Sequence, residues 1–270
     1  MTQQIDIRPH IARKRFGQHF LHDPAVIRRI LRAIDPRPGQ TLVEIGPGLG
    51  ALTGALLTLI GHLHAIELDR DLARRLTAQF PQTLSLHIAD ALDFDFTALA
   101  NANHSLRIVG NLPYNISTPL LFHLLTQSQH IRDMHFMFQR EVANRITASP
   151  GDIHYGRLSV MTQWHCQTQK LFDIGPGAFR PPPRITSSIV RLTVRAQPPA
   201  FVPDLAILQR LVARAFSQRR KTLRNSLRKF LTPDRIRAAG IDPGARPETL
   251  NLLQFAALSA QVMTTKNNGK

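Results

Sequence analysis

The residues best suited to chemistry form the tetrapeptide Asn111-Leu112-Pro113-Tyr114, which follows a short apolar stretch at positions 106–109. The side-chain oxygen of Asn111 and the main-chain carbonyl of Leu112 could accept hydrogen bonds from an exocyclic amine. Pro113 restricts the local backbone and removes a donor that would point the wrong way. The ring of Tyr114 could stack on a flat base. These four residues therefore make a candidate catalytic site for an adenine.

Such a site could activate an adenine amine, which is a poor nucleophile because its lone pair is delocalised into the ring. Accepting hydrogen bonds from both amine protons draws the nitrogen toward a tetrahedral shape and makes the lone pair available. A methyl group could then pass in line from a sulfonium donor, driven by positioning and charge placement. Neither a metal nor a covalent intermediate is needed. The alternative is a plain turn between a strand and a helix.

A glycine-rich segment, Glu44-Ile45-Gly46-Pro47-Gly48-Leu49-Gly50, lies upstream of this tetrapeptide. Gly46 and Gly48 permit a tight turn whose N–H groups can approach a ligand at the start of a helix. Glu67 follows Gly46 by 21 residues, which also fits the acid of a dinucleotide-binding fingerprint. A nicotinamide-dependent oxidoreductase is therefore one interpretation of this segment taken alone.

Three acidic residues favour S-adenosyl-L-methionine over a dinucleotide. Glu44 could hold the cationic amino group of the methionine, whereas it would repel a pyrophosphate. Glu67 could bind the ribose, and Asp90, which follows the next predicted strand, could contact the adenine. The candidate cofactor-binding residues from this reasoning are Glu44, Gly46, Gly48, Glu67, Asp90 and Asn111.

The elements that must position these residues alternate between strands and helices, which predicts an α/β fold with a parallel, Rossmann-like sheet and the sites at one edge. Strands are predicted at 41–45, 63–68, 84–88, 106–109, 134–138, 159–164 and 188–194. Helices are predicted at 25–34, from 51, at 72–80 and at 115–125.

Two domains are predicted, because Pro198, Pro199 and Pro203 mark a linker. Residues 1–198 would form the catalytic domain, and residues 199–270 a small all-α domain. The proline-rich segment at 179–184 could also present Phe179 opposite Tyr114, so that the two rings enclose a flipped base.

The charge of the chain predicts a polyanionic partner. Lys and Arg number 34 against 18 acidic residues, a net charge of +16, and each neutralised phosphate releases a condensed counterion. Residues 205–233 hold eight basic and no acidic side chains. A basic stripe recurring every four residues beside leucines 223, 227 and 231 predicts a single RNA-contacting helix. Its candidate RNA contacts are Arg219, Arg220, Lys221, Arg224 and Arg228.

Other classes are disfavoured. The single cysteine, Cys166, excludes an internal disulfide and a cysteine-rich zinc site. No apolar run approaches the ~18 residues that would span a bilayer. A cytoplasmic protein without a metal is expected.

At these residues the chain resembles the ribosomal RNA adenine dimethyltransferases, and most closely their bacterial small-subunit branch. The resemblance covers nearly the whole chain. It runs through residues 13–21, 43–50, 66–69, 90, 110–119, 156–160, 179–188 and 218–227.

The resemblance implies a class I S-adenosylmethionine-dependent methyltransferase that dimethylates two adjacent adenosines in the 3′-terminal hairpin loop of 16S rRNA. The partner would be 16S rRNA in the pre-30S subunit, bound by a monomer. The resemblance also implies that residues 18–21 help close over the cofactor, which adds His19 and Leu21 to the contacts. The family commonly has Asn where this chain has His19, and a histidine could gain charge and weaken cofactor binding in acid.

Two related alternatives remain. One is a large-subunit rRNA adenine methylase, and the other is a non-catalytic RNA-binding assembly factor on the same fold. The block at 219–227 favours the small-subunit enzyme. Glu67, Asp90 and Asn111 are intact, which favours catalysis.

Overall fold

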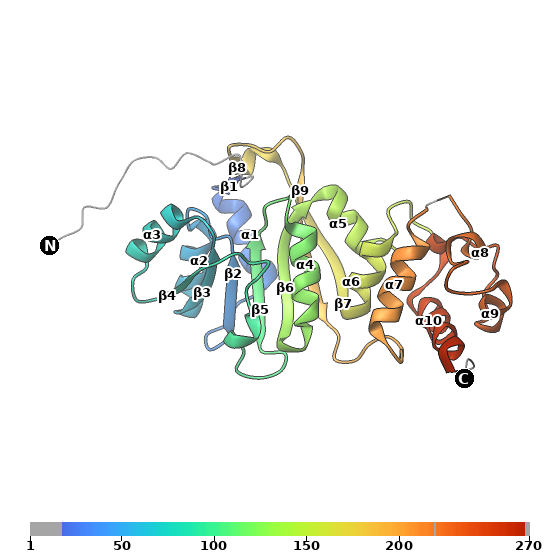
Figure 1. Ribbon diagram of the computed structural model, residues 1–270. Helices are drawn as coiled ribbons and strands as arrows, with labels where there is room; N and C mark the ends of the chain where they lie inside the picture. The colour runs from blue at the N-terminus through green and yellow to red at the C-terminus, as the bar shows by residue number, and fades with distance from the viewer. Residues whose placement is uncertain (1–17, 219, 268–270) are drawn as a thin grey trace. The chain divides into compact units, whose positions relative to one another are not determined.

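The computed structural model describes residues 18–218 and 220–267. Its main sheet has seven strands in the order β4-β3-β2-β5-β6-β9-β7. Adjacent pairs from β4 to β6 are parallel, whereas β9 is antiparallel to β6. The strands are β2 (Thr41–Ile45), β3 (Leu63–Glu67), β4 (Leu84–Ile88), β5 (Leu106–Asn111), β6 (Ile131–Gln139), β7 (Cys166–Ile174) and β9 (Ser187–Val194). The predicted α/β class with a Rossmann-like sheet is confirmed (Figure 1).

The first helix beside the sheet begins where the sequence places a cap. Asp23 accepts from the main-chain N–H groups of Ala25 and Val26 at 2.7 and 3.2 Å, and Pro24 occupies the first turn. One core cluster joins α1 and α2 to one buried residue from each of β2, β5, β6 and β9, namely Leu42, Val109, Met137 and Ile189. These helices are α1 (Pro24–Ile34), α2 (Ala51–Ile60), α3 (Arg70–Gln79), α4 (Ser117–Thr126) and α5 (Arg140–Thr147).

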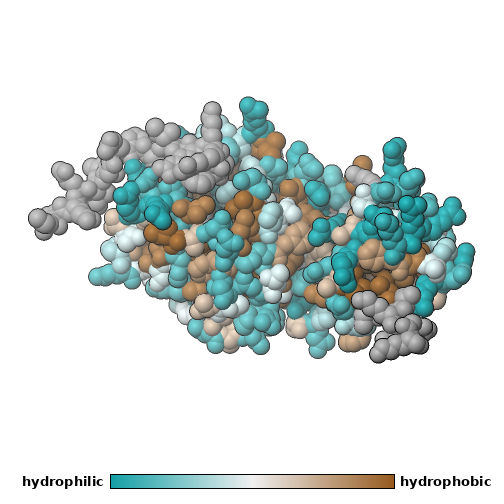
Figure 2. Space-filling model, viewed as in Figure 1, coloured by the Kyte–Doolittle hydropathy of each residue, from teal (hydrophilic) through white to brown (hydrophobic). Residues whose placement is uncertain are grey.

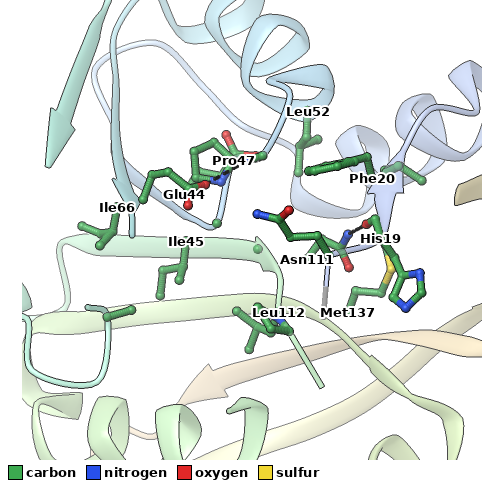
Figure 3. Close-up of a pocket in the computed structure, with 18 of the residues that line it drawn as sticks. His19, Phe20, Glu44, Ile45, Pro47, Leu52, Ile66, Asn111, Leu112 and Met137 are labelled. Carbon is green, nitrogen blue, oxygen red and sulfur yellow. Dashed lines mark hydrogen bonds between the residues drawn. The ribbon is translucent and has the colours of Figure 1, made fainter. Parts of the chain in front are cut away.

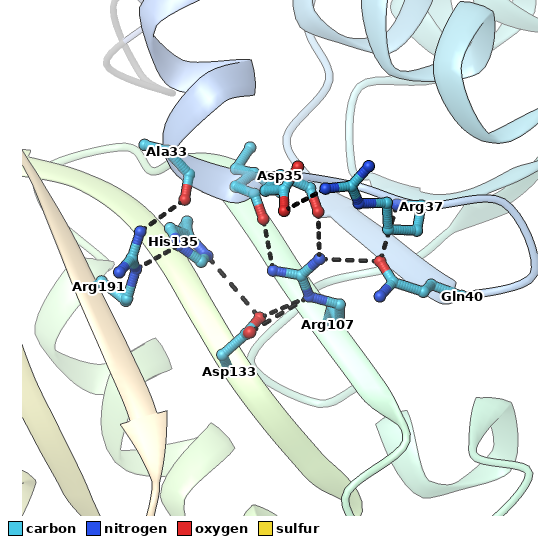
Figure 4. A network of polar contacts seen from close by, with 9 residues as sticks. Ala33, Asp35, Arg37, Gln40, Arg107, Asp133, His135 and Arg191 are labelled. Atoms are coloured by element: carbon cyan, nitrogen blue, oxygen red, sulfur yellow. Dashed lines mark hydrogen bonds and ion pairs between the residues drawn. The ribbon is translucent and has the colours of Figure 1, made fainter.

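A buried polar network ties the end of α1 to β5, β6 and β9 (Figure 4). The Arg107 guanidinium donates to both oxygens of Asp133 through Nε at 3.0 and 3.2 Å, and its other nitrogens donate to Gln40 and to the carbonyls of Ile34 and Asp35. Both members of the ion pair are buried. Because a buried charge is tolerated only when it is paired and hydrogen-bonded, this network fixes how α1 meets the sheet.

Two elements of secondary structure differ from the sequence prediction. The predicted strand at 159–164 is wrong: this segment lies in the helix α6 (Arg157–His165), and the strand β7 follows it. The side chains of α6 are buried around nearly its whole circumference. A buried helix and a buried strand both appear as short apolar runs, so periodicity could not separate them. The short ladder of β1 (Phe20–Leu21) with β8 (Phe179–Arg180) was also not predicted.

The described residues group into two compact units. The first holds the residues up to Ala143 together with Gln169–Val194, and the second holds Asn144–Thr168 together with the residues from Arg195 onward. The chain thus passes from one unit to the other at 143/144, 168/169 and 194/195, and α6 belongs with the C-terminal helices. The domain boundary after residue 198 stays a prediction.

The second unit is helical around its own core. Its remaining helices are α7 (Leu205–Ala215), α8 (Leu223–Ser226), α9 (Pro233–Ala238) and α10 (Leu252–Asn267). Leu208, Leu211 and Phe255 are completely buried within it. The side chains of α10 are described only as far as residue 262.

The predicted single helix carrying the basic stripe is wrong. Regular helix extends only over α8, and Thr222 is its N-cap, so Arg220 lies before the helix. The carbonyl of Ser226 accepts from Nε of Arg214 at 3.1 Å, and the N–H of Phe230 bonds instead to Leu227. A hydrogen bond from Arg214 of α7 therefore occupies the Ser226 carbonyl, which would accept from the N–H of Phe230 if α8 continued. Leucines 223, 227 and 231 are nevertheless all buried, as their spacing indicated.

Candidate cofactor and target-base site

A cavity of about 250 Å³ opens at the carboxyl edge of the parallel strands in the first unit. It is lined by the loop after β2, the ends of β3, β4 and β5, and the segment around β1 (Figure 3). The structure brings together almost all the predicted cofactor and base residues here. They are His19, Leu21, Glu44, Gly46, Gly48, Glu67, Asp90, Asn111, Leu112, Pro113 and Tyr114.

The glycine loop adopts a backbone that side chains rarely permit. Gly46, Gly48 and Gly50 have φ angles of +68°, +60° and +81°. A Cβ atom on Gly48 would also lie 3.0 Å from the Phe20 ring. The loop therefore needs glycine both for its turn and for the close approach of Phe20, and it leads directly into α2.

Glu44 lies on β2 at the floor of this cavity with only 2% of its surface exposed. The Thr53 hydroxyl donates to its Oε2 atom at 2.7 Å. Burial raises the pKa of the Glu44 carboxyl to about 7, although the Thr53 bond opposes this shift. The site thus holds a carboxyl that can become ionised when a cation arrives.

Glu67 ends β3 and is tied to the glycine loop. Its two carboxylate oxygens accept from the main-chain N–H groups of Gly48 at 3.3 Å and Asp69 at 2.9 Å. Burial is the main cause that raises the pKa of Glu67. Asp90, one step along the sheet edge, accepts from the N–H of Leu92 at 2.9 Å and is only partly buried. The two acids stand at successive strand ends, as a ribose and an adenine site would require.

The side chain of Asn111 is held by His19, which lies 92 positions earlier in the sequence. Its Nδ2 group donates to the main-chain oxygen of His19 at 2.8 Å (Figure 3). This bond identifies the donor end of the carboxamide, so Oδ1 is the end that can accept from an amine. The neighbouring Leu112 is only 1% exposed as a whole residue, yet it lies in the lining of the cavity.

Tyr114 is half-buried and contacts two side chains. Its hydroxyl lies 2.8 Å from Oγ of Ser187, and its ring stacks against His19 with centroids 5.9 Å apart and planes at 28°. Burial raises the pKa of the Tyr114 phenol, which keeps it neutral. The His19 ring is itself held by a contact of 2.8 Å between Nδ1 and the Pro181 carbonyl.

Phe179 does not form the predicted second wall in this structure. Phe179 is 2% exposed as a whole residue, belongs to the core cluster that contains Ile30 and Ala178, and does not line the cavity. The cause is the pairing of β8 with β1, which sets Phe179 opposite Leu21 and turns both toward the core. The ring beside Tyr114 is that of His19.

Sequence reasoning missed three described residues of the site. Ser187 anchors Tyr114, Thr53 donates to Glu44, and His135 lines the cavity from β6. Burial lowers the pKa of His135 to about 4. Thr53 lies nine residues beyond Glu44 on the helix that the glycine loop opens, which is a usable signal. No local pattern in the sequence marks Ser187 or His135 as part of the site.

The basic residues of the second unit are placed at its surface. Arg220, Lys221, Arg224 and Arg228 are exposed, and among the described residues none of them pairs with a carboxylate. Arg219 lies outside the described residues, as do residues 13–17 of the N-terminal block. Figure 2 shows hydrophilic side chains over much of the visible face near α8 and α9.

Two further features are absent from the part of the chain that the structure describes. Residues 18–218 and 220–267 contain no cluster of three or more His, Cys, Asp or Glu side chains arranged to hold a metal ion. Within the same ranges, no helix has both the length and the apolar character needed to cross a membrane.

Comparison with known proteins gives the same family that the sequence motifs resemble. Residues 10–262 match the family model described as ribosomal RNA adenine dimethylase. The chain is 54% identical to the ribosomal RNA small subunit methyltransferase A of Pseudomonas aeruginosa, over 97% of this chain and 99% of that protein.

Two solved structures share the fold. A dimethyladenosine transferase from Plasmodium falciparum superposes with a TM-score of 0.75 at 24% identity, covering 89% of this chain and 96% of that one. The 23S rRNA methyltransferase ErmE superposes with a TM-score of 0.72 at 26% identity, covering 90% of this chain and 99% of that one. With the family model matching nearly its full length, this chain belongs to the ribosomal RNA adenine dimethylase family.

Proposed function

We propose that this protein uses S-adenosyl-L-methionine to dimethylate the exocyclic amines of two adjacent adenosines in the 3′-terminal hairpin loop of 16S rRNA. The observation that carries the proposal is a single cavity that joins the glycine loop and its acids to residues 111–114. The 54% identical relative, whose name specifies the small ribosomal subunit, supports the choice of RNA.

The residues present fit this cofactor. Glu44 would bind its cationic amino group, the N–H groups of the glycine loop would lie along its methionine portion, and Glu67 and Asp90 would hold ribose and adenine. When bound, the cofactor supplies a methyl group on a positively charged sulfur. The buried Glu44 carboxyl and the left-handed turn at Gly46 and Gly48 support this assignment, because both suit a ligand that carries a cation and needs close approach of the backbone.

The chain's own part in the reaction is to position and activate the amine. Oδ1 of Asn111 and the carbonyl of Leu112 would accept from its two N–H groups, which localises the lone pair on nitrogen. Tyr114 would stack on the base and hold it in line with the methyl group. After each transfer the methylated amine gives up one proton to solvent water. These roles explain why an amide, a peptide carbonyl and a ring occupy one strand end.

The second unit would supply the RNA contacts. Its residues include 16 basic and five acidic side chains, a net charge of +11. Arg220, Lys221, Arg224 and Arg228 would bind phosphates, together with Arg219. Because they do not lie on one helix, they would follow the backbone shape of structured RNA rather than a single groove. We propose the pre-30S subunit as the partner, bound by a monomer.

The test is labelled methyl transfer to separated, unmethylated small and large ribosomal subunits, followed by nucleoside analysis. The proposal expects dimethyladenosine in small-subunit RNA alone. Label in the large subunit would instead favour the activity named for ErmE, and label in neither, with RNA still bound, would favour a non-catalytic assembly factor. Asn111→Ala serves as the control that separates the chain's own activity from a contaminant.

A further inference from the structure

The hydroxyl of Tyr114 is anchored by a residue that lies 73 positions further along the chain. The Tyr114 hydroxyl and Oγ of Ser187 are 2.8 Å apart, and Ser187 is completely buried. Ser187 begins β9 and is in register with Gln139 of β6. The N–H of Arg140 donates to the Thr186 carbonyl at 3.0 Å, which extends the ladder beyond the strand. Ser187 is therefore held by main-chain bonds on both sides of its own position.

A tyrosine ring without this bond would be placed less firmly. Its other described ring contact is the offset stack on His19, and stacking alone tolerates sliding and tilting. The Ser187 bond holds the hydroxyl at the far end of the ring, so that a swing of the ring about the Cα–Cβ bond, or a slide of the ring, would break a hydrogen bond in a half-buried site. The hydroxyl thus has a positioning use even though it takes no part in methyl transfer.

We propose that Ser187 is a positioning residue that holds the far end of the Tyr114 ring in place for the target base. This inference rests on the proposed role of Tyr114 as the stacking wall. It predicts that the contribution of tyrosine over phenylalanine at position 114 comes through Ser187, and that Ser187 itself contacts neither base nor cofactor.

The second methyl transfer should depend on this contact more than the first. An unmethylated amine offers two N–H groups to the two acceptors, Asn111 Oδ1 and the Leu112 carbonyl. A monomethylated amine has a single N–H, so one acceptor bond is lost and stacking carries more of the alignment. A loosened Tyr114 ring should therefore slow the conversion of monomethyl- to dimethyladenosine in particular.

The experiment compares Ser187→Ala, Tyr114→Phe and the double variant in single-turnover methylation of unmethylated small subunits. Monomethyl- and dimethyladenosine are quantified over time. Each single variant should slow the second transfer by about three- to tenfold, the range expected for one neutral hydrogen bond, and should slow the first transfer less. The double variant should be no slower than either single variant, because all three remove the same bond.

Ser188→Ala is the matched control. Ser188 is the next residue of β9, is equally buried, and donates to Asp173 Oδ1 at 2.6 Å instead of contacting the site. It should lower the midpoint of thermal unfolding while leaving the ratio of monomethyl to dimethyl product unchanged. If Ser187→Ala does no more than Ser188→Ala to that ratio, the proposal is overturned. Tyr114→Phe removes the same bond from the cavity side and decides the matter even if Ser187→Ala folds poorly.

Tyr114→Ala separates this inference from the proposed function. If Tyr114→Ala keeps full turnover, the stacking role is wrong. If Tyr114→Ala loses turnover while Tyr114→Phe and Ser187→Ala both keep the normal product ratio, the stacking role stands and the positioning role of Ser187 is refuted.

Discussion

The side-chain nitrogen of Asn111 donates to the main-chain oxygen of His19 at 2.8 Å, across 92 positions of sequence. This bond links the residue before β1, a strand that pairs with β8 outside the main sheet, to the end of β5. It settles the orientation of the carboxamide, because the amino end is committed to a carbonyl and the oxygen end is left for the ligand. One contact thus couples the cofactor side of the cavity to the base side.

Replacing Asn111 tests this orientation. Asn111→Ala should keep cofactor and RNA binding but lower turnover by about 10²- to 10³-fold, the cost of removing one preorganised polar group at a reacting centre. Asn111→Asp should be no better, because a carboxylate oxygen would face the His19 carbonyl without a proton between them. Single-turnover rates and a cofactor titration give the two quantities. Normal turnover in Asn111→Ala would refute the assignment.

Cofactor binding should be linked to the ionisation of Glu44. Its pKa of about 7 means that the carboxyl is largely protonated at pH 6 and ionised at pH 8. Because a cationic amino group prefers the ionised form, affinity should rise between pH 6 and pH 8 and then level off. Isothermal titration calorimetry across this range measures the change.

Thr53→Val is the matched variant for this linkage. It keeps the side-chain shape but removes the hydroxyl that donates to Glu44, so the pKa should rise further and the affinity curve should move to higher pH. Glu44→Gln should bind weakly, with a smaller change of affinity over the same range. A wild-type affinity that stays constant from pH 6 to pH 8 would contradict the linkage.

Glu44 should also lower the stability of the ligand-free protein at high pH. A carboxyl whose folded-state pKa is raised from 4.5 to about 7 binds a proton that the unfolded chain has already lost. Stability from this group is therefore present at low pH and is lost as the pH rises from about 4.5 through 7. Glu44→Gln should be more stable than wild type at pH 8, by an amount on the order of 3 kcal/mol at most.

The comparison must be made against wild type at each pH. The lowered pKa of His135 acts in the opposite sense, because its stabilising contribution is lost as the pH falls toward about 4. Denaturant unfolding of wild type and Glu44→Gln at pH 5 and pH 8 isolates the contribution of Glu44 to the free energy of unfolding. If the difference between the two proteins does not grow with pH, Glu44 does not hold a proton in the folded state.

The buried Arg107–Asp133 ion pair should be essential for folding stability but not for methyl transfer. Asp133→Asn leaves a buried guanidinium without a counter-charge, which should cost about 3 to 5 kcal/mol of unfolding free energy. Arg37→Gln removes one partner of an exposed ion pair at 2.9 Å and should cost less than about 1 kcal/mol. Chemical denaturation measures both. A loss of less than about 1 kcal/mol in Asp133→Asn would show that the network tolerates the unpaired charge.

Neutralising the exposed cations of the second unit should weaken RNA binding and its dependence on salt. Changing Arg220, Lys221 and Arg224 together to Gln should reduce the slope of log affinity against log salt by about 2 to 3, while cofactor affinity is unchanged. Arg132→Gln, at an exposed position near the start of β6, is the control for general charge. An equal loss per charge in the control would mean that the second unit has no special part in binding RNA.

The local pattern of residues was sufficient for the α/β class and for the acidic and amide residues that line the cavity at the strand ends. Glu44, Glu67, Asp90 and Asn111 stand at or just after the ends of strands, and strand ends in a parallel sheet converge on one edge. Residues that are distant in sequence therefore meet for a reason that the order of elements already contains. The tight turn of the glycine loop could also be predicted from the sequence, because glycine is the residue that most readily adopts positive φ angles.

Features that depend on contacts between distant segments could not be read in this way. The inward turn of Phe179 follows from the pairing of β8 with β1, and the anchoring of Tyr114 by Ser187 follows from the register of β9 on β6. The early end of α8 follows from Arg214 taking the Ser226 carbonyl. Each outcome is set by a hydrogen bond whose partner local sequence does not specify, since burial and register emerge only when the chain is packed.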